Sequence, residues 1–234
     1  SNDETSEPYE TKTLTAQTYA IDPVLDYGLI PLEHLTIGYM IYTDFVFRGN
    51  ASLAQLNHVF QTLKAANIDE FILDLRYNQG GYIFAVKQLC SLLAPEEVVE
   101  NEELLIHKRW NKAYQERYAN DPDRLEEHFD KSVPLDSRLN LKRLWVITSH
   151  VTASASEMLI SALSPYMKVN VVGDLTMGKN MGGIIYTPND KDLQNWNIML
   201  ISTEYSNSRE ESVKGGIPPM FPILEQFHHQ HQLG

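Results

Sequence analysis

Apolar residues recur along this chain with two spacings, and together these spacings predict strands that alternate with helices. Short runs rich in β-branched and aromatic residues are typical of strands, whereas apolar residues three and four positions apart are typical of a helix with one buried face. The expected strands are residues 37–42, 70–75, 144–148 and 169–173, and the expected helices are residues 52–66, 83–93 and 154–163. This order predicts an α/β fold with right-handed crossovers and a mostly parallel sheet.

Several segments fall outside that pattern. Residues 1–36 are expected to form a lead-in, since their polar start resembles the edge of a fragment. Residues 96–142 are dense in charge, and we interpret them as a helical or irregular insertion that is either a solvated decoration or a lid contacting substrate. The insertion carries scattered aromatic residues, namely Trp110, Tyr114, Tyr118 and Phe129. Residues 183–187 and 196–203 are expected to add further strands.

Composition and charge disfavour several classes of function. A chain of 234 residues, 43% hydrophobic and 21% charged, is expected to fold around a core. Its net charge of −12 disfavours binding to nucleic acid, and no apolar run approaches the ~20 residues of a membrane span. The single cysteine, Cys90, cannot form an internal disulfide and lies in an apolar stretch that indicates core packing. His228, His229 and His231 lack a carboxylate or cysteine at clear ligand spacing, so we expect no metal and no cofactor.

The candidate chemistry begins with Ser154, in the segment Thr152-Ala-Ser-Ala-Ser-Glu157. This serine stands where a strand is expected to end and a helix to begin. Unpaired backbone N–H groups at such a position can stabilise an oxyanion. The same residues also match the S-x-x-E capping box, in which Ser154 would only cap the helix.

Lys179 follows 25 positions after Ser154, in the segment Thr176-Met-Gly-Lys-Asn-Met-Gly-Gly183. A serine and a lysine brought together can form a nucleophile and its base. The base must lose its proton near neutral pH, against a reference pKa of about 10.4, which requires desolvation of the amine. We therefore expect Lys179 to be largely buried and unpaired by carboxylates. The structural alternative is a lysine in a surface turn.

A third motif is Asp74-Leu-Arg-Tyr-Asn-Gln-Gly-Gly81, directly after a buried strand. Paired glycines before a helix allow a backbone N–H to point at a ligand. The lysine and Ser/Thr of a nucleotide-binding P-loop are missing here. Asp74 and Arg76 are expected to satisfy local hydrogen bonds and to take no part in chemistry.

The order of these three motifs and the spacing from serine to lysine resemble the S41 family of serine peptidases, the tail-specific or C-terminal processing proteases, in particular exported members from Bacteroides-type bacteria. The resemblance implies a crotonase-like (ClpP/crotonase) α/β catalytic core over residues 37–234, which acts on unfolded or C-terminal segments of proteins or peptides. It also implies that Ser154 is the nucleophile and Lys179 the general base. Ala155 and Gly81, with Gly80 as a further candidate, would supply the N–H groups of the oxyanion hole, and Ser156 would be structural.

The chain departs from the family pattern in two ways. The residues before Ile37 are too few for the PDZ domain that family members usually carry, and Gly183 stands where some relatives have a glutamine. Two alternative functions therefore remain. One is a catalytically weak binding module on the same fold, since the family resemblance includes retinoid-binding relatives. The other is an acyl-CoA enzyme of the crotonase type, which would not need the Ser–Lys pair. The oligomeric state is not predicted.

Overall fold

The computed structural model describes residues 12–13, 15–16, 22–46, 50–193 and 195–223. The histidines near residue 230 and about half of the N-terminal lead-in therefore lie outside the described residues. The main sheet has six strands in the order β1-β2-β3-β6-β7-β10. Its strands are β1 (Val24–Pro31), β2 (Thr36–Tyr42), β3 (Glu70–Asp74), β6 (Arg143–Thr148), β7 (Lys168–Gly173) and β10 (Phe221–Pro222). All neighbours run parallel except β1, which is antiparallel to β2. The predicted α/β fold with a mostly parallel sheet is confirmed.

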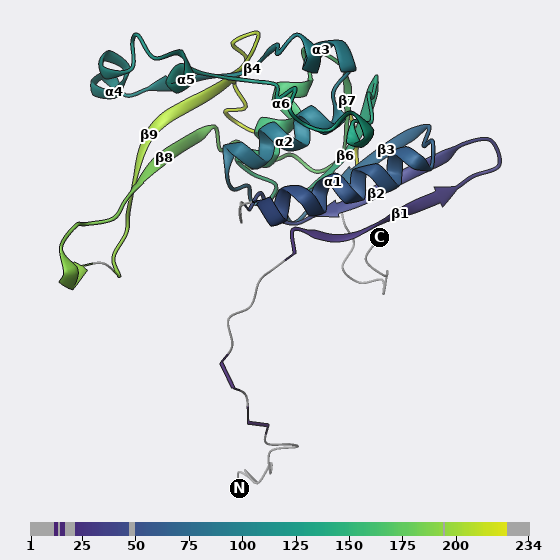
Figure 1. Ribbon diagram of the computed structural model, residues 1–234, viewed down its shortest axis with the longest axis horizontal. Coiled ribbons are helices and arrows are strands. Elements are labelled where there is room, and N and C mark those ends of the chain that lie inside the picture. The colour runs from purple at the N-terminus through teal and green to yellow at the C-terminus, as the bar shows by residue number, and fades with distance from the viewer. Residues whose placement is uncertain (1–11, 14, 17–21, 47–49, 194, 224–234) are drawn as a thin grey trace, which may run out of the picture.

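Three helices pack on one face of this sheet: α1 (Asn50–Ala65), α2 (Ile83–Leu93) and α6 (Ala155–Leu163) (Figure 1). Their apolar faces and the inward side chains of the strands form one core cluster. Each helix begins and ends within about two residues of the predicted range, because its apolar face repeats with the helical period. Cys90 is fully buried in this core, and burial raises the pKa of its thiol. No helix in the part of the chain that the structure describes is long and apolar enough to cross a membrane.

The structure differs from the sequence prediction at β1, which lies within the expected lead-in. Strand β1 forms one edge of the sheet and has only β2 as its neighbour. Most of its side chains are exposed, apolar Leu25 and Leu29 among them. The strand is thus held by backbone pairing with β2, and its sequence shows no clear alternation of apolar and polar residues that would have predicted it.

The insertion also differs from its prediction. It is expected from its sequence to be helical or irregular, but it contains β4 (Leu104–Trp110), a strand that lies between two others in a sheet. The insertion comprises α3 (Glu96–Glu100), β4, α4 (Lys112–Arg117), α5 (Pro122–Leu125), β5 (Glu126–His128) and the 3₁₀ helix η1 (Leu135–Ser137). Strand β4 joins a second, antiparallel sheet in the order β5-β4-β9-β8. Strand β9 (Ile198–Asn207), which pairs with β4, and strand β8 (Met181–Tyr186), which pairs with β9, fulfil the prediction of later strands. Lys108 is buried in β4, which is why this strand has no apolar pattern.

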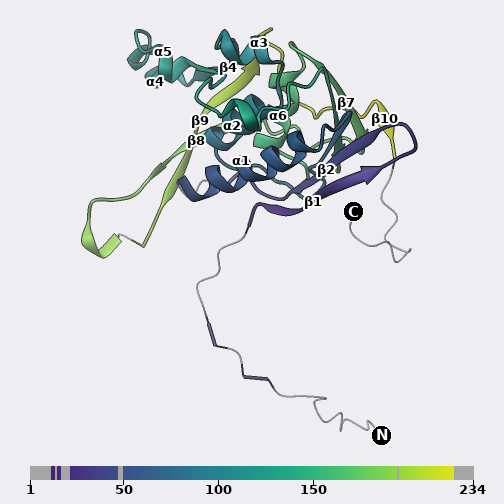
Figure 2. The same cartoon turned by 45° about the vertical axis from the view of Figure 1, so that its right-hand side comes forward.

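Strands β8 and β9 stay paired with each other beyond the end of β4, which pairs only with residues 203–207 of β9. They form a long hairpin that projects away from the helices, closed by the 3₁₀ helix η2 (Lys191–Leu193) (Figures 1 and 2). The two views agree that the distal half of this hairpin lies apart from the body.

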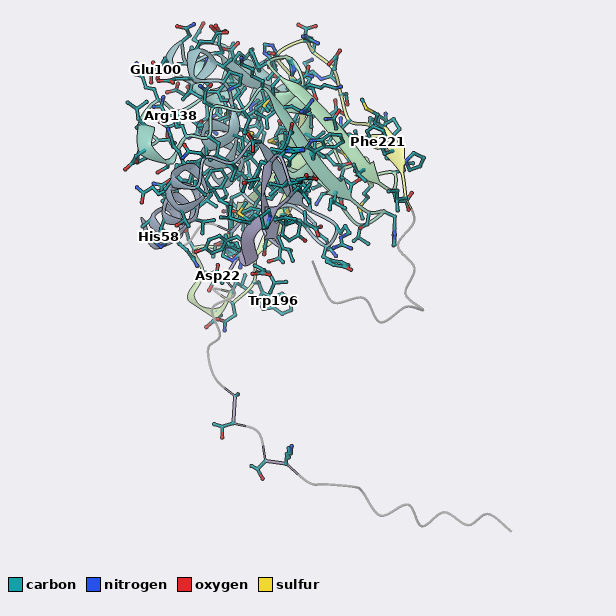
Figure 3. All side chains as sticks on the ribbon, turned by 90° about the vertical axis from the view of Figure 1, so that its right-hand side faces the viewer. Asp22, His58, Glu100, Arg138, Trp196 and Phe221 are labelled. Atoms are coloured by element: carbon teal, nitrogen blue, oxygen red, sulfur yellow. The ribbon has the colours of Figure 1, made fainter. Side chains whose placement is uncertain are left out.

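The last loop of the insertion is held in shape by the guanidinium of Arg138, whose side chain is almost fully buried. It donates to Val133 O (2.9 Å), to Lys131 O (2.6 Å) and to the carboxylate of Glu100. Arg138 and Glu100 lie on the same side of the molecule (Figure 3). Two backbone carbonyls of the loop thus depend on one cation for their hydrogen bonds.

We expect Arg138→Met to lower the free energy of unfolding by about 2–4 kcal/mol, since it removes a buried charged donor from three acceptors. Urea denaturation measures the loss. The control is Arg109→Met, because Arg109 forms an exposed pair with Glu204, and such pairs contribute about 1 kcal/mol or less. Equal losses in the two variants would contradict the role of Arg138 in holding this loop.

Candidate active site

The serine motif and the paired-glycine motif meet at the carboxyl ends of β3 and β6, neighbours in the parallel sheet. Ligands of open α/β sheets bind at this edge. Hydrogen bonds join the loop after β6 to the loop after β3, among them those from Thr152 Oγ1 to Leu75 O (2.8 Å) and from Ala153 N to Asn78 O (3.2 Å). These bonds bring residues 74–81 and 152–157 into contact.

Ser154 is the N-cap of α6 and is half-buried. Its backbone has φ 57° and ψ −114°, a conformation that few residues other than glycine adopt. Strain of this kind costs of the order of 1–3 kcal/mol and persists only where the surroundings enforce it. Ala155 follows as the first helical residue, so its N–H has no acceptor within the helix. The serine hydroxyl and a backbone donor are thereby placed side by side at the positive end of the helix dipole.

The paired glycines lie directly against this helix start. A Cβ on Gly80 would stand 2.7 Å from Ser154 Cβ and 2.8 Å from Ala155 N, so no side chain fits there. The N–H of Gly80 donates to Asn78 Oδ1 (2.8 Å). This corrects the expectation that Gly80 is a candidate oxyanion donor, because its only N–H is already engaged. Gly80 instead allows the turn of residues 80–81 to pack closely against Ser154 and Ala155.

Gly81 is different, because its N–H has no acceptor among the residues that the structure describes. Phe45 pairs with the two flanking residues: its N–H donates to Gly80 O (3.0 Å), and its carbonyl accepts from Tyr82 N (2.7 Å). A Cβ on Gly81 would lie 2.2 Å from Phe45 O, and its φ is 145°. Both facts require glycine. Within the described residues, the N–H groups of Gly81 and Ala155 are thus left without a backbone acceptor.

Glu157 connects the serine to the lysine motif, residues 176–183. Its carboxylate is fully buried and accepts the N–H of Ser154 (2.8 Å) and the N–H of Lys179 (2.8 Å). It also accepts Gly178 N (2.5 Å) and Thr176 Oγ1 (2.6 Å). The sequence analysis assigned Glu157 only to a capping box, which is present. The structure adds that one carboxylate binds the backbone of both Ser154 and Lys179.

Ser154 and Lys179 line the same small pocket, whose wall includes the apolar side chains of Ile106, Met158 and Val213. The expectation that Lys179 is buried is wrong, since its side chain is exposed. Its segment runs along the rim of the pocket, where Met177 is also exposed. Within the described residues, Lys179 Nζ makes no hydrogen bond to Ser154. Glu157 therefore fixes the backbone of the lysine and leaves the amine in solvent.

Tyr205 of β9 completes the pocket and was missed in the sequence. Its N–H donates to Asn180 O (3.0 Å), and its hydroxyl lies against Gly182, where a Cβ would be 1.5 Å away. Burial raises the pKa of Tyr205 to about 12, so the phenol is neutral at physiological pH. The paired glycines after Lys179 were the available signal that a large side chain packs there.

The remaining motif residues are structural. Asp74 accepts hydrogen bonds from Arg76 Nε (3.0 Å) and from Tyr39 Oη (2.9 Å), as expected for a locally satisfied carboxylate. Ser156 is fully buried, and its hydroxyl donates to Asn78 O (3.0 Å). Asn78 in turn donates its side-chain amide to Tyr42 O (2.9 Å). These contacts hold the glycine turn in place beneath the helix start.

Known proteins resemble this chain in both sequence and fold. The carboxyl-terminal-processing protease of Synechocystis sp. is 25% identical over 169 residues, which are 72% of this chain and 34% of that protein. An S41-assigned protease from Bacteroides fragilis has a crystal structure that is 26% identical, with a TM-score of 0.78, and the match covers 89% of this chain and 52% of that one. The photosystem II D1 C-terminal processing protease shares the fold at 19% identity, with a TM-score of 0.62 and coverage of 88% and 50%.

This chain therefore spans between about a third and a half of the length of these relatives. The sequence model of Peptidase family S41 matches residues 36–222, which include all three motifs and every residue of the pocket. Since this match covers most of the chain, the protein belongs to peptidase family S41.

Proposed function

We propose that this chain is the catalytic part of a serine endopeptidase with a Ser–Lys dyad. Ser154 would be the nucleophile and Lys179 the general base. The observation that carries the proposal is the Glu157 carboxylate, which binds the backbone of both residues and sets them around one pocket. A binding protein would have no need to hold a serine and a lysine in fixed relation.

The proposed reaction begins when Ser154 Oγ attacks the carbonyl carbon of a peptide bond and Lys179 Nζ takes the hydroxyl proton. The oxygen of the tetrahedral intermediate accepts hydrogen bonds from the N–H groups of Gly81 and Ala155. Collapse of the intermediate breaks the C–N bond, and Lys179 returns the proton to the leaving amine. Water then hydrolyses the acyl-serine by the same two steps.

The exposed position of Lys179 indicates when the base becomes active. An amine surrounded by water favours its charged form, and desolvation disfavours it. A substrate lying across the pocket would cover the amine and remove that water. We therefore place activation of Lys179 at substrate binding, where contacts that are loose in the free enzyme commonly tighten.

The substrates we propose are unfolded or C-terminal segments of proteins, in line with the names of the processing proteases that this chain resembles. We also propose that the protein is exported and that its catalytic core is of the crotonase-like type, both as the family resemblance implies. One observation favours the alternative of a catalytically weak binding module, namely that Lys179 is exposed and not bonded to Ser154. The following three variants separate these functions.

Ser154→Ala is expected to abolish hydrolysis of casein and labelling by a fluorophosphonate probe, because no other nucleophile occupies the proposed position. The free energy of unfolding should fall by at most about 1–2 kcal/mol, the contribution of a helix cap. Ser156→Ala is the matched control: it should lose about 1 kcal/mol of stability and keep its labelling. Unchanged turnover in Ser154→Ala would remove Ser154 as the nucleophile.

Lys179→Arg is expected to be nearly as inactive as Lys179→Ala, because a guanidinium stays protonated at every working pH. For the wild type, the rate of hydrolysis should show no histidine-like step near about pH 6.5, because the proposed reaction uses no histidine. Lys168→Arg, at the start of β7, serves as the control. Substantial turnover by Lys179→Arg would favour the binding module or a different base.

Glu157→Gln is expected to lower kcat at least 100-fold, because the amide group of glutamine would face backbone N–H donors that need an acceptor. The free energy of unfolding should also fall, by about 2–4 kcal/mol. Labelling by the fluorophosphonate is measured well below the unfolding temperature, so that loss of alignment is separated from loss of fold. A folded Glu157→Gln variant with wild-type labelling would contradict the alignment role, and exposed Glu204→Gln is the control.

A further inference from the structure

The projecting part of the β8–β9 hairpin, residues 184–201, is here called the arm. Its strands carry large apolar side chains that are exposed. Between 47% and 56% of each residue's surface is accessible for Ile185, Tyr186, Ile198, Met199, Leu200 and Ile201. Trp196, at the distal end of the arm, is exposed to 69% (Figure 3). Soluble proteins rarely expose contiguous apolar surface of this kind unless it binds something.

Both faces of the arm are apolar. Residues opposite each other in an antiparallel pair share a face, and successive residues alternate between faces. The pair Ile185–Met199 therefore lies on one face, and the pairs Ile184–Leu200 and Tyr186–Ile198 lie on the other. A partner with one flat surface would cover only half of these side chains.

The outer edge of the arm is also open. In the described part of the chain β8 pairs only with β9, so its other edge has unpaired backbone N–H and C=O groups. Natural edge strands are commonly protected by charged side chains or proline. Strand β8 and residues 198–203 contain neither. The absence of charge there also disfavours a partner recognised by electrostatic attraction.

The open edge runs directly into the proposed catalytic site. Strand β8 begins two residues after Lys179. Gly183 of β8 and Tyr205 of β9 line a cavity of about 510 Å³ together with Ile83, which follows the oxyanion-hole candidate Gly81 by two residues. A chain paired along β8 would therefore be led past this cavity toward Ser154.

We propose that the arm binds an extended, apolar segment of an unfolded polypeptide as an additional strand on the edge of β8, and so delivers that segment to Ser154. The inference rests on the proposed peptidase function and names its substrate class. Strand addition supplies main-chain hydrogen bonds, while alternate side chains of the added strand contact both faces. A strand is the one occupant that satisfies the open edge and both apolar faces together.

The test uses the Ser154→Ala chain, so that binding is measured without cleavage. The probe is a fluorescein-labelled peptide of 16 residues with apolar residues on both faces and uncharged flanks, because the net charge of −12 would attract a basic peptide. Fluorescence anisotropy gives its Kd. A second peptide has the same side chains but N-methylated amides at alternate positions, and we expect it to bind at least tenfold more weakly because it cannot add as a strand.

The arm is altered by Ile185→Lys with Met199→Glu, a cross-strand pair of opposite charge that preserves the hairpin. We expect at least a tenfold weaker Kd. The control is Leu25→Lys with Leu29→Glu on β1, where the exposed fractions of 56% and 47% match those of the arm. The Kd of the control variant should stay within twofold of the Kd of the Ser154→Ala chain. Equal effects in both variants, or none in the arm variant, would overturn the proposal.

A measurement on the unaltered arm covers the case in which the arm variant does not fold. Hydrogen exchange of the Ser154→Ala chain, with and without peptide, should show at least tenfold slower exchange within β8, because its edge amides gain partners. No added protection in β8 would contradict strand addition. If light scattering instead shows a dimer that the arm variant dissociates while peptide affinity is unchanged, a second copy is the occupant and the proposal fails.

The tests of the arm can fail or succeed independently of the tests of the proposed peptidase function. Peptide binding by Ser154→Ala does not depend on catalysis, and loss of hydrolysis in Ser154→Ala does not depend on the arm. An active enzyme whose arm variant hydrolyses casein at the wild-type rate would retain the peptidase assignment and reject the arm as a substrate site.

Discussion

The arrangement of this site depends on a single buried carboxylate. Glu157 accepts four hydrogen bonds and has no exposed surface, so water cannot replace any of its partners. A carboxylate in such a place is stable because backbone N–H groups and the N-terminus of α6 surround it. The backbone positions of Ser154 and Lys179 follow from that requirement. The relative position of these two backbones is therefore set by the hydrogen bonds that Glu157 needs, and not by contact between the side chains of Ser154 and Lys179.

The steric constraints on the other side of Ser154 are equally strict. The backbone of residues 80 and 81 passes so close to Ser154 and Phe45 that neither position accepts a side chain. Asn78 fixes this turn by bonding within the loop and to β2. The N–H of Gly80 is engaged in this turn, whereas the N–H of Gly81 has no acceptor among the described residues.

The sequence predicted most of the main sheet and its helices, since buried strands and one-sided helices carry their periodicity in the residues themselves. It failed at β1 and β4, because β1 is exposed and β4 buries Lys108, so neither shows a regular apolar pattern. Ser154 and Lys179 were identified from their motifs. The exposure of Lys179 and the contact of Tyr205 with Gly182 depend on the position of β9, which pairs with the distant β4. No local pattern encodes that pairing.

The hydrogen-bond partners of Glu157 also bear on the order of events during folding. They come from residues 154–157 and 176–179, and the glycine turn beside them comes from residues 78–81. These segments are far apart in sequence and meet only when β3, β6 and β7 lie side by side. A chain that has not yet paired these strands holds a serine without an aligned lysine. The completed sheet is thus a precondition for the site, since a partly folded copy holds Ser154, Lys179 and the glycine turn in separate segments.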